Sequence, residues 1–228
     1  SLMFAIALAV AAIPEALSSI VTIVLSFGTQ RMSREHAIMR KLRTVEGLGS
    51  VSVICSDKTG TLTQNKMTVR KISVREQIID ADSVSTEDPN VRELIAASVL
   101  CSDASCQDGT EIGDPTETAL VRFAQDCGLS DKKMRTDHPR VGEIPFDSER
   151  KLMSTLNRCG DMRKMYTKGA TDVLLERMLI SDEEKKAIRE RSEELSEQGL
   201  RVLCFAEKTF CGEALDVTDE NDLTYLGL

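Results

Sequence analysis

The first part of the chain is almost uniformly apolar. Residues 2–27 carry one charged side chain, Glu15, and several basic residues follow directly. Because about 20 apolar residues span a bilayer, this stretch predicts a transmembrane helix within residues 1–29. The basic flank places the chain after about residue 30 in the cytoplasm, as in an integral membrane protein. A secretory signal peptide is the alternative, but it would be shorter and would begin with basic residues.

A second apolar run, at residues 51–55, is short and rich in β-branched side chains. This pattern predicts a buried parallel strand. Asp57 follows at the carboxyl end of that strand, where open α/β sheets bind ligands. The next loop contains Gly60, and its N–H and hydroxyl groups suit a phosphate. Asp57 is therefore a candidate nucleophile toward a phosphoryl group, with a simple Asx turn as the alternative.

From residue 68 onward, short alternating runs and amphipathic stretches follow one another. The pattern predicts a strand at 69–74, a helix at 89–102, a polar loop at 101–113, a helix at 115–128, a hairpin of residues 152–156 and 162–167, a charged helix at 181–198 and a strand at 199–206. This order of elements predicts an α+β domain with an antiparallel sheet flanked by helices.

Three of the expected helices have clear start signals. Asp88 and Asp114 each precede a proline, the arrangement of an N-cap followed by proline at the first helical position. Glu117 stands three residues after Asp114 and would complete a capping box. Ser181 and Glu184 have the same spacing at the start of the charged helix.

Composition narrows the classes of function. The net charge of −8 argues against a general nucleic-acid binder, which usually has a basic balance. The seven cysteines are an odd number without a Cys-x-x-Cys pair, so we expect reduced thiols rather than a disulfide framework. His36 and His138 have no cysteine partners at zinc spacing, so no zinc site is expected.

The residues around Asp57 also resemble a known motif. The string Ser-Asp-Lys-Thr-Gly-Thr-Leu-Thr-Gln-Asn-Lys-Met-Thr at 56–68 is similar to the phosphorylation motif of P-type ATPases, cation pumps with a haloacid-dehalogenase-like phosphorylation domain. The resemblance implies that Asp57, with Lys58 and Thr59, accepts the γ-phosphate of ATP as an aspartyl-phosphate. It also implies Mg²⁺ at Asp57 and Thr59. Residues 30–67 would be the stalk and the Rossmann-like start of that domain.

The apolar stretch carries a second resemblance. Val-Ala-Ala-Ile-Pro-Glu-Ala-Leu at 10–17 is similar to the fourth transmembrane helix of calcium pumps of the sarco/endoplasmic reticulum type. An acid at membrane depth is a functional candidate, and Pro14 breaks the helix beside it. Transported Ca²⁺ would be held by the carbonyls of Val10, Ala11 and Ile13 and the carboxylate of Glu15. Ala16 departs from the usual glycine, and other helices must supply the remaining ligands.

Three later segments, at 113–120, 144–154 and 168–170, resemble the nucleotide-binding domain of these pumps, which would span residues 68–228. The resemblance implies an ATP site made by Glu117, Phe146, Lys151, Lys168 and Arg201. Phe146 would stack on the base, with an ordinary core position as the alternative. Ser148 replaces an arginine that the calcium pumps usually have.

The resemblance covers nearly the whole chain but only the middle of a pump. The later motifs Thr-Gly-Asp and Gly-Asp-Gly-x-Asn-Asp do not occur in the sequence, so Asp57 is expected to be nearly inert by itself. The expected partners are ATP, membrane lipid and the remaining parts of the same pump, without nucleic acid. Alternatives are an isolated nucleotide-binding fragment without turnover and a sodium–potassium-type or Mn²⁺ pump. Thr59 disfavours a haloacid-dehalogenase phosphatase, which usually has a second aspartate there.

Overall fold

The computed structural model describes residues 2–11, 16–107, 110–212 and 214–228. By its internal contacts the chain divides into two compact units, Ser1–Leu62 and Thr63–Leu228. The boundary between the predicted stalk and the predicted nucleotide domain, at residues 67 and 68, stays a prediction.

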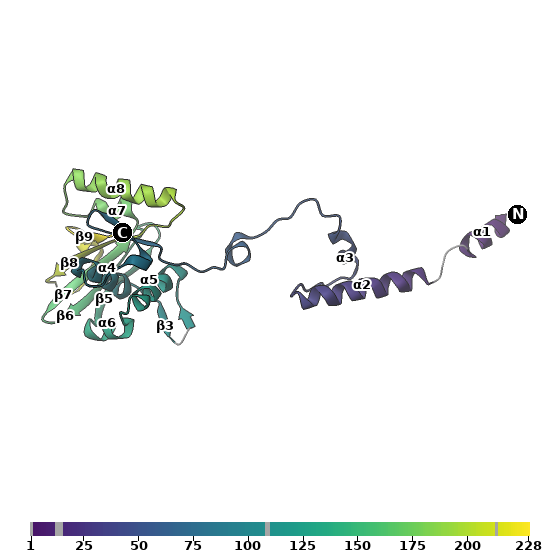
Figure 1. Ribbon diagram of the computed structural model, residues 1–228, viewed down its shortest axis with the longest axis horizontal. Helices are drawn as coiled ribbons and strands as arrows, with labels where there is room; N and C mark the ends of the chain where they lie inside the picture. The colour runs from purple at the N-terminus through teal and green to yellow at the C-terminus, as the bar shows by residue number, and fades with distance from the viewer. Residues whose placement is uncertain (1, 12–15, 108–109, 213) are drawn as a thin grey trace. The chain divides into compact units, whose positions relative to one another are not determined.

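The regular elements in the described part of the first unit are helices (Figure 1). Its elements are α1 (Leu2–Ala11), α2 (Leu17–Arg34), α3 (Arg43–Leu48) and the short turn η1 (Lys58–Leu62). Large apolar side chains of α2 are exposed, among them Ile23 at 54% and Phe27 at 67%. The single span predicted at residues 2–27 coincides with α1 and α2, whereas residues 12–15 lie outside the described part. Within the residues described, none of the helices combines the length and apolar character that crossing a bilayer requires.

The strand predicted at residues 51–55 does not form in this structure. Residues 51–57 have no regular secondary structure, and the side chains of Val53 and Ile54 are 74% and 86% exposed. A strand exists only through hydrogen bonds to a neighbouring strand, and none of the described strands pairs with this segment. The apolar pattern therefore predicted a strand that lacks a partner here.

The second unit is built on a five-stranded antiparallel sheet with the order β5-β6-β7-β8-β9. Its strands are β5 (Arg140–Asp147), β6 (Leu152–Cys159), β7 (Met162–Gly169), β8 (Cys204–Phe210) and β9 (Thr224–Gly227). Two small hairpins accompany it, β1 (Lys71–Val74) with β2 (Gln77–Asp80) and β3 (Ser105–Gln107) with β4 (Thr110–Ile112). The described helices of the unit are α4 (Pro89–Leu100), α5 (Pro115–Asp126), α6 (Asp131–Asp137), α7 (Thr171–Leu175), α8 (Asp182–Glu197) and the short η2 (Ala81–Ser83) and η3 (Val217–Asp219). The predicted α+β class with an antiparallel sheet and flanking helices is confirmed.

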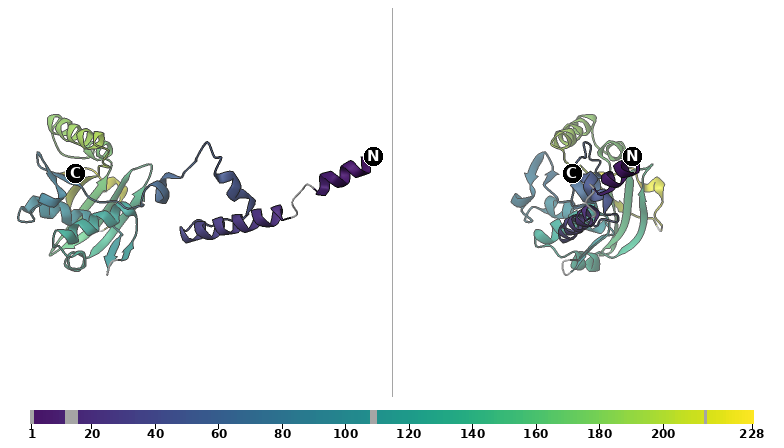
Figure 2. Two further views of the ribbon diagram at one scale, coloured as in Figure 1. Left: turned by 45° about the vertical axis from the view of Figure 1, so that its right-hand side comes forward. Right: turned by 90° about the vertical axis from the view of Figure 1, so that its right-hand side faces the viewer.

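Helices cover both faces of this sheet (Figure 1; Figure 2). Side chains alternate between the faces along each strand. Met153 and Tyr166 belong to a core shared with α4 and α5, whereas Leu152, Leu156 and Met165 belong to a core shared with α7 and α8. Two apolar cores therefore fix the sheet from opposite sides.

The caps form largely as predicted. The side chains of Asp88 and Asp114 accept hydrogen bonds from the N–H groups of Asn90 and Thr116, at 2.9 and 2.8 Å. Ser181 and Glu184 form the expected capping box of α8. Two expectations were wrong. The polar loop at 101–113 contains the hairpin β3–β4, and β8 begins only at Cys204 because the residues before it do not pair with β7.

We expect Gly169→Ala to destabilise the second unit, because a Cβ there would overlap the carbonyl oxygen of Lys151 and lie 2.5 Å from Cδ2 of Leu152. Overpacking of this kind costs about 2 kcal/mol. Gly142→Ala is the matched control in the same sheet, since its Cβ would lie 3.6 Å from Leu156, an ordinary contact. Urea unfolding followed by circular dichroism measures both changes, and equal stability of the two variants would contradict the prediction.

Candidate functional site

A buried ion pair joins the start of α5 to the end of β7. Oε1 of Glu117 lies 2.5 Å from Nζ of Lys168, and the two side chains are only 15% and 7% exposed. Lys168 also donates a hydrogen bond to Oγ of Ser102, at 3.2 Å. Burial of an ammonium group is costly unless a countercharge and hydrogen bonds surround it, so the pair is a strong local electrostatic feature.

The second carboxylate oxygen of Glu117 orders the loop after α4. Oε2 accepts hydrogen bonds from the backbone N–H groups of Asp103 and Ala104, at 2.8 and 3.1 Å. The capping box expected from Glu117 and Asp114 was therefore wrong, because this carboxylate binds a different loop and Lys168. Nothing in the local sequence indicated this partner, which lies 14 residues earlier in the chain.

The end of α4 contacts the same strands through Cys101. Its thiol donates to the carbonyl oxygens of Met153 and Tyr166, at 3.4 and 3.5 Å. Burial raises the pKa of this thiol to about 11, although the charge of Lys168 opposes the shift. Cys101 is therefore a neutral packing residue beside Lys168 rather than a reactive one.

Strand register brings the other predicted nucleotide residues to the same end of the sheet. Met153 of β6 pairs with Lys168, and Leu152 pairs with both Gly169 and Asp147. The turn that joins β5 to β6 therefore lies at this end, and it carries Phe146 and Lys151 at its two sides.

Phe146 is 60% exposed, which rules out the alternative of an ordinary core phenylalanine. Lys151 has a positive φ of 56°, its side chain is 54% exposed, and its Nζ lies 3.9 Å from Oδ2 of Asp172. Ser148, at the position of the missing arginine, is also exposed. This end of the sheet thus presents an aromatic ring and an exposed cation to solvent.

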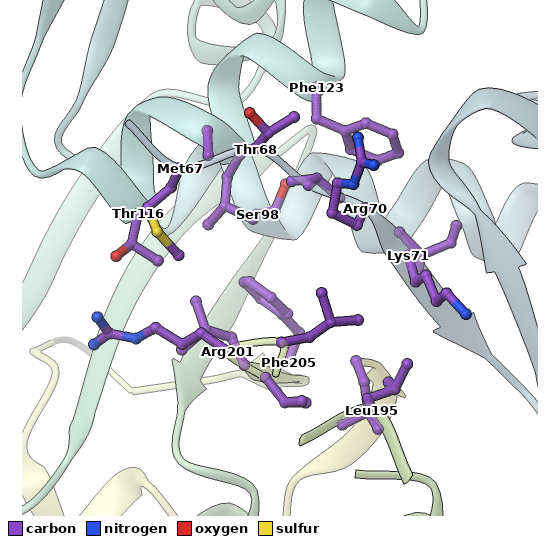
Figure 3. A pocket seen from close by; sticks show the side chains of 18 of the residues that line it. Met67, Thr68, Arg70, Lys71, Ser98, Thr116, Phe123, Leu195, Arg201 and Phe205 are labelled. Atoms are coloured by element: carbon purple, nitrogen blue, oxygen red, sulfur yellow. The ribbon is translucent and has the colours of Figure 1, made fainter. Parts of the chain in front are cut away.

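Arg201 precedes β8, is exposed, and lines a cavity of about 220 Å³ in the second unit. Figure 3 shows Arg201 and Phe205 on one side of this cavity, facing Met67, Ser98 and Thr116 on the other. Of the predicted nucleotide residues, Arg201 lines it, whereas Glu117, Phe146, Lys151 and Lys168 do not. The cavity adjoins the ion pair, because Thr116 directly precedes Glu117 and Phe205 pairs with Lys168 in the sheet.

The charge of Arg201 acts on the cap of α5. Partial burial of Asp114 opposes its ionisation, but hydrogen bonds from Thr116 and the nearby Arg201 hold its pKa below the usual range. Asp114 is therefore a stable carboxylate at the start of the helix that carries Glu117.

The remaining predicted site residues belong to the first unit. Asp57, Lys58 and Thr59 are exposed, and Gly60 has a positive φ of 74°. Asp57 and Thr59 offer oxygen ligands of the kind that Mg²⁺ binds, but only two of the six it takes.

Two of the four predicted Ca²⁺ residues are in α1. Val10 and Ala11 are its last two residues, whereas Ile13 and Glu15 lie outside the described part of the chain. Among the described residues, His, Cys, Asp and Glu side chains form no group of three or more with metal-binding geometry.

We expect Glu117→Gln to lower the free energy of unfolding by about 3 kcal/mol, because Lys168 would remain buried without a countercharge. Lys168→Met in the same chain should recover much of this loss, so the two changes should be strongly non-additive. Urea unfolding of the native chain, the two single variants Glu117→Gln and Lys168→Met, and the double variant measures the coupling energy. Lys151→Met removes an exposed ion pair instead and should change stability by less than about 1 kcal/mol. Additive effects of the Glu117 and Lys168 changes would rule out a stabilising pair.

Comparison with known proteins identifies the family of the chain. Residues 90–228 match the family model of the P-type ATPase cytoplasmic domain N. A calcium-transporting ATPase of Lactococcus lactis is 46% identical over 100% of this chain. Relatives of the same name from Listeria monocytogenes and Saccharomyces cerevisiae are 47% and 36% identical over 99% and 98% of it. The chain spans 27% of the length of each of these three relatives. On this evidence the chain belongs to the P-type ATPase family.

Proposed function

We propose that the unit Thr63–Leu228 binds ATP at the end of the sheet that carries Phe146 and Lys168. The observation that carries this proposal is the combination of an exposed aromatic ring and a buried, paired lysine on strands that flank β6 at one end. Nucleotide sites combine these parts, an aromatic face for the base and fixed positive charge for the phosphates. Membership of the family supports the same location.

Each residue of the proposed site has a distinct role. Phe146 stacks on the adenine, and Glu117 accepts a hydrogen bond from its amino group while holding Lys168 in place. Lys168, Lys151 and Arg201 supply positive charge along the nucleotide. Ser148 cannot supply the charge that an arginine would, so we expect weaker phosphate binding than in a chain with arginine at that position.

We further propose that Asp57 is the phosphoryl acceptor of the full-length pump. A carboxylate oxygen of Asp57 bonds to the γ-phosphorus, the bond to the bridging oxygen breaks, and ADP leaves. Lys58 and Thr59 hold the transferred group, and Mg²⁺ at Asp57 and Thr59 would neutralise its charge. Residues 51–55 would then form a strand of the phosphorylation domain once paired with neighbouring strands.

For the parent protein we propose ATP-driven cation transport, most consistent with Ca²⁺, through the aspartyl-phosphate at Asp57. The names of the relatives and the sequence Val-Ala-Ala-Ile before Pro14 support Ca²⁺ over a sodium–potassium-type pump, and Mn²⁺ is the second candidate. Residues 2–27 would lie in the membrane, as their exposed apolar side chains suggest. The carbonyls of Val10, Ala11 and Ile13 and the carboxylate of Glu15 would bind the ion.

For the 228-residue chain by itself we propose ATP binding without turnover. The sequence contains neither Thr-Gly-Asp nor Gly-Asp-Gly-x-Asn-Asp. It therefore lacks the further residues that, in the pumps it resembles, would bind the phosphate and Mg²⁺. Phosphoryl transfer depends on positioning and on metal electrostatics rather than on a nucleophile alone. Measurable ATP hydrolysis by the purified chain would overturn this point.

Calorimetric titration of ATP into the 228-residue chain tests the proposed site. Phe146→Ala should weaken binding about tenfold or more, because stacking of a base on an aromatic ring is worth about 1–3 kcal/mol. Lys168→Ala should weaken it at least as much. Met162→Ala is the control, since Met162 is 61% exposed at the opposite end of β7. Absence of binding by the folded native chain, or equal affinity of Phe146→Ala, would refute the site.

A further inference from the structure

Glu220 is a fully buried acid outside the proposed nucleotide site. Its Oε1 accepts hydrogen bonds from Nη1 of Arg150 at 2.5 Å and from Oγ of Ser154 at 2.6 Å. Its Oε2 lies 3.6 Å from Nη1 of Arg177. Burial of a carboxylate is costly unless cations and hydroxyl groups surround it. Oε1 has such partners, whereas Oε2 has only the ion pair with Arg177 and accepts no hydrogen bond from the described residues.

Arg150 connects this acid to the strand that carries Phe146. Its side chain is 12% exposed, and its Nη2 donates a hydrogen bond to the carbonyl oxygen of Pro145 at 2.6 Å. Pro145 directly precedes Phe146 in β5. One guanidinium therefore binds Glu220 with one nitrogen and the backbone beside Phe146 with the other. A planar, five-donor group suits such a bridge, whereas the single ammonium of a lysine does not.

The turn between β5 and β6 is held from inside as well. Oδ1 of Asp147 accepts hydrogen bonds from the N–H groups of Glu149 and Arg150, at 3.0 and 2.8 Å. The N–H of Lys151 donates to the carbonyl oxygen of Asp147 at 2.6 Å. The turn is thus a defined structure, and the side chain of Arg150 leaves it in one direction, toward Glu220.

We propose that Arg150 and Glu220 form a clamp that positions Phe146 and the turn after it for the base of the nucleotide, an inference that rests on the proposed ATP site. Both are positioning residues and neither contacts the nucleotide. Glu220 is fully buried, and its partner Ser154 binds Thr167 on the face of the sheet that α7 and α8 cover. Lys168 points to the opposite face, toward Ser102 and Glu117.

The clamp restricts the backbone at Pro145, and the ring of Phe146 depends on that backbone for its position. Without the carboxylate of Glu220, Arg150 loses the anchor that holds its guanidinium over the turn. The ring of Phe146 is itself 60% exposed and packs against little else. A nucleotide would then have to order the turn on binding, which weakens the affinity.

Calorimetric titration of ATP into five forms of the 228-residue chain tests the clamp: native, Glu220→Gln, Phe146→Ala, the double variant Phe146→Ala/Glu220→Gln, and Lys164→Met. We expect Glu220→Gln to weaken binding about tenfold. In the double variant the affinity should equal that of Phe146→Ala within about twofold, because the ring that Glu220 positions is gone.

Lys164→Met is the matched control, because Lys164 forms ion pairs with Glu93 and Glu207 at 2.8 and 3.0 Å on the same sheet, away from the turn. It should leave the ATP affinity unchanged. If Glu220→Gln does not fold, Arg150→Lys replaces it, because it weakens the clamp at its other end while keeping the charge.

Three outcomes would overturn the clamp. Unchanged affinity of a folded Glu220→Gln chain would show that the pair is structural only. Additive losses in the double variant would show that Glu220 acts independently of Phe146. If the native chain binds ATP but either of these two outcomes is found, the clamp is wrong and the ATP site stands. If the native chain does not bind ATP, both fall together.

Discussion

The ion pair between Glu117 and Lys168 is the interaction on which the proposed site depends. It connects the first turn of α5 to the last residues of β7, and Glu117 also holds the backbone at Asp103 and Ala104. The helix α5, the loop after α4 and the central sheet therefore meet at one carboxylate. An apolar pair of the same size would hold these elements together at a lower cost in desolvation. A charged pair at this place suits the proposed ligand, ATP, which has charged phosphates and polar base edges.

A second charged group lies on the other face of the same sheet. Strand alternation sends Ser154 and Thr167 toward α7 and α8, where Glu220 binds Arg150, and sends Lys168 toward α4 and α5. The turn between β5 and β6 is thus supported from one face while its neighbouring lysine is supported from the other. In the proposed site, Phe146 thus follows a backbone group that Arg150 binds, and Lys168 is paired on the other face, an arrangement that suits a preorganised site.

Local sequence predicted the elements well where local physics determines them. The aspartate caps before Pro89 and Pro115 and the capping box of α8 depend on neighbouring residues only, and all three formed. The alternating residues of β6 and β7 predicted their hairpin for the same reason. The strand predicted at residues 51–55 is not formed in this structure because a strand needs a partner, which the pattern of one segment does not specify.

The site itself was less accessible to local reasoning. The resemblance proposed positions 117, 146 and 168 as site residues, but the contacts of Glu117 are to a loop 14 residues away in sequence and to Lys168, 51 residues away. Spacing along one helix instead suggested a capping box. The pair of Arg150 and Glu220 is separated by 70 residues, and neither residue has a local signal of its own. Such contacts depend on strand register and therefore on the whole fold.

The most direct test of the central claim is nuclear magnetic resonance mapping of MgATP on the isotope-labelled 228-residue chain. We expect the amide signals of the loop at 101–104, the turn at 146–151, Gly169 and Arg201 to shift together with one dissociation constant. Shifts at the cavity residues Met67, Ser98 and Phe123 without shifts at the loop, the turn or Gly169, or no shifts at all in the folded chain, would contradict an ATP site organised by Glu117 and Lys168.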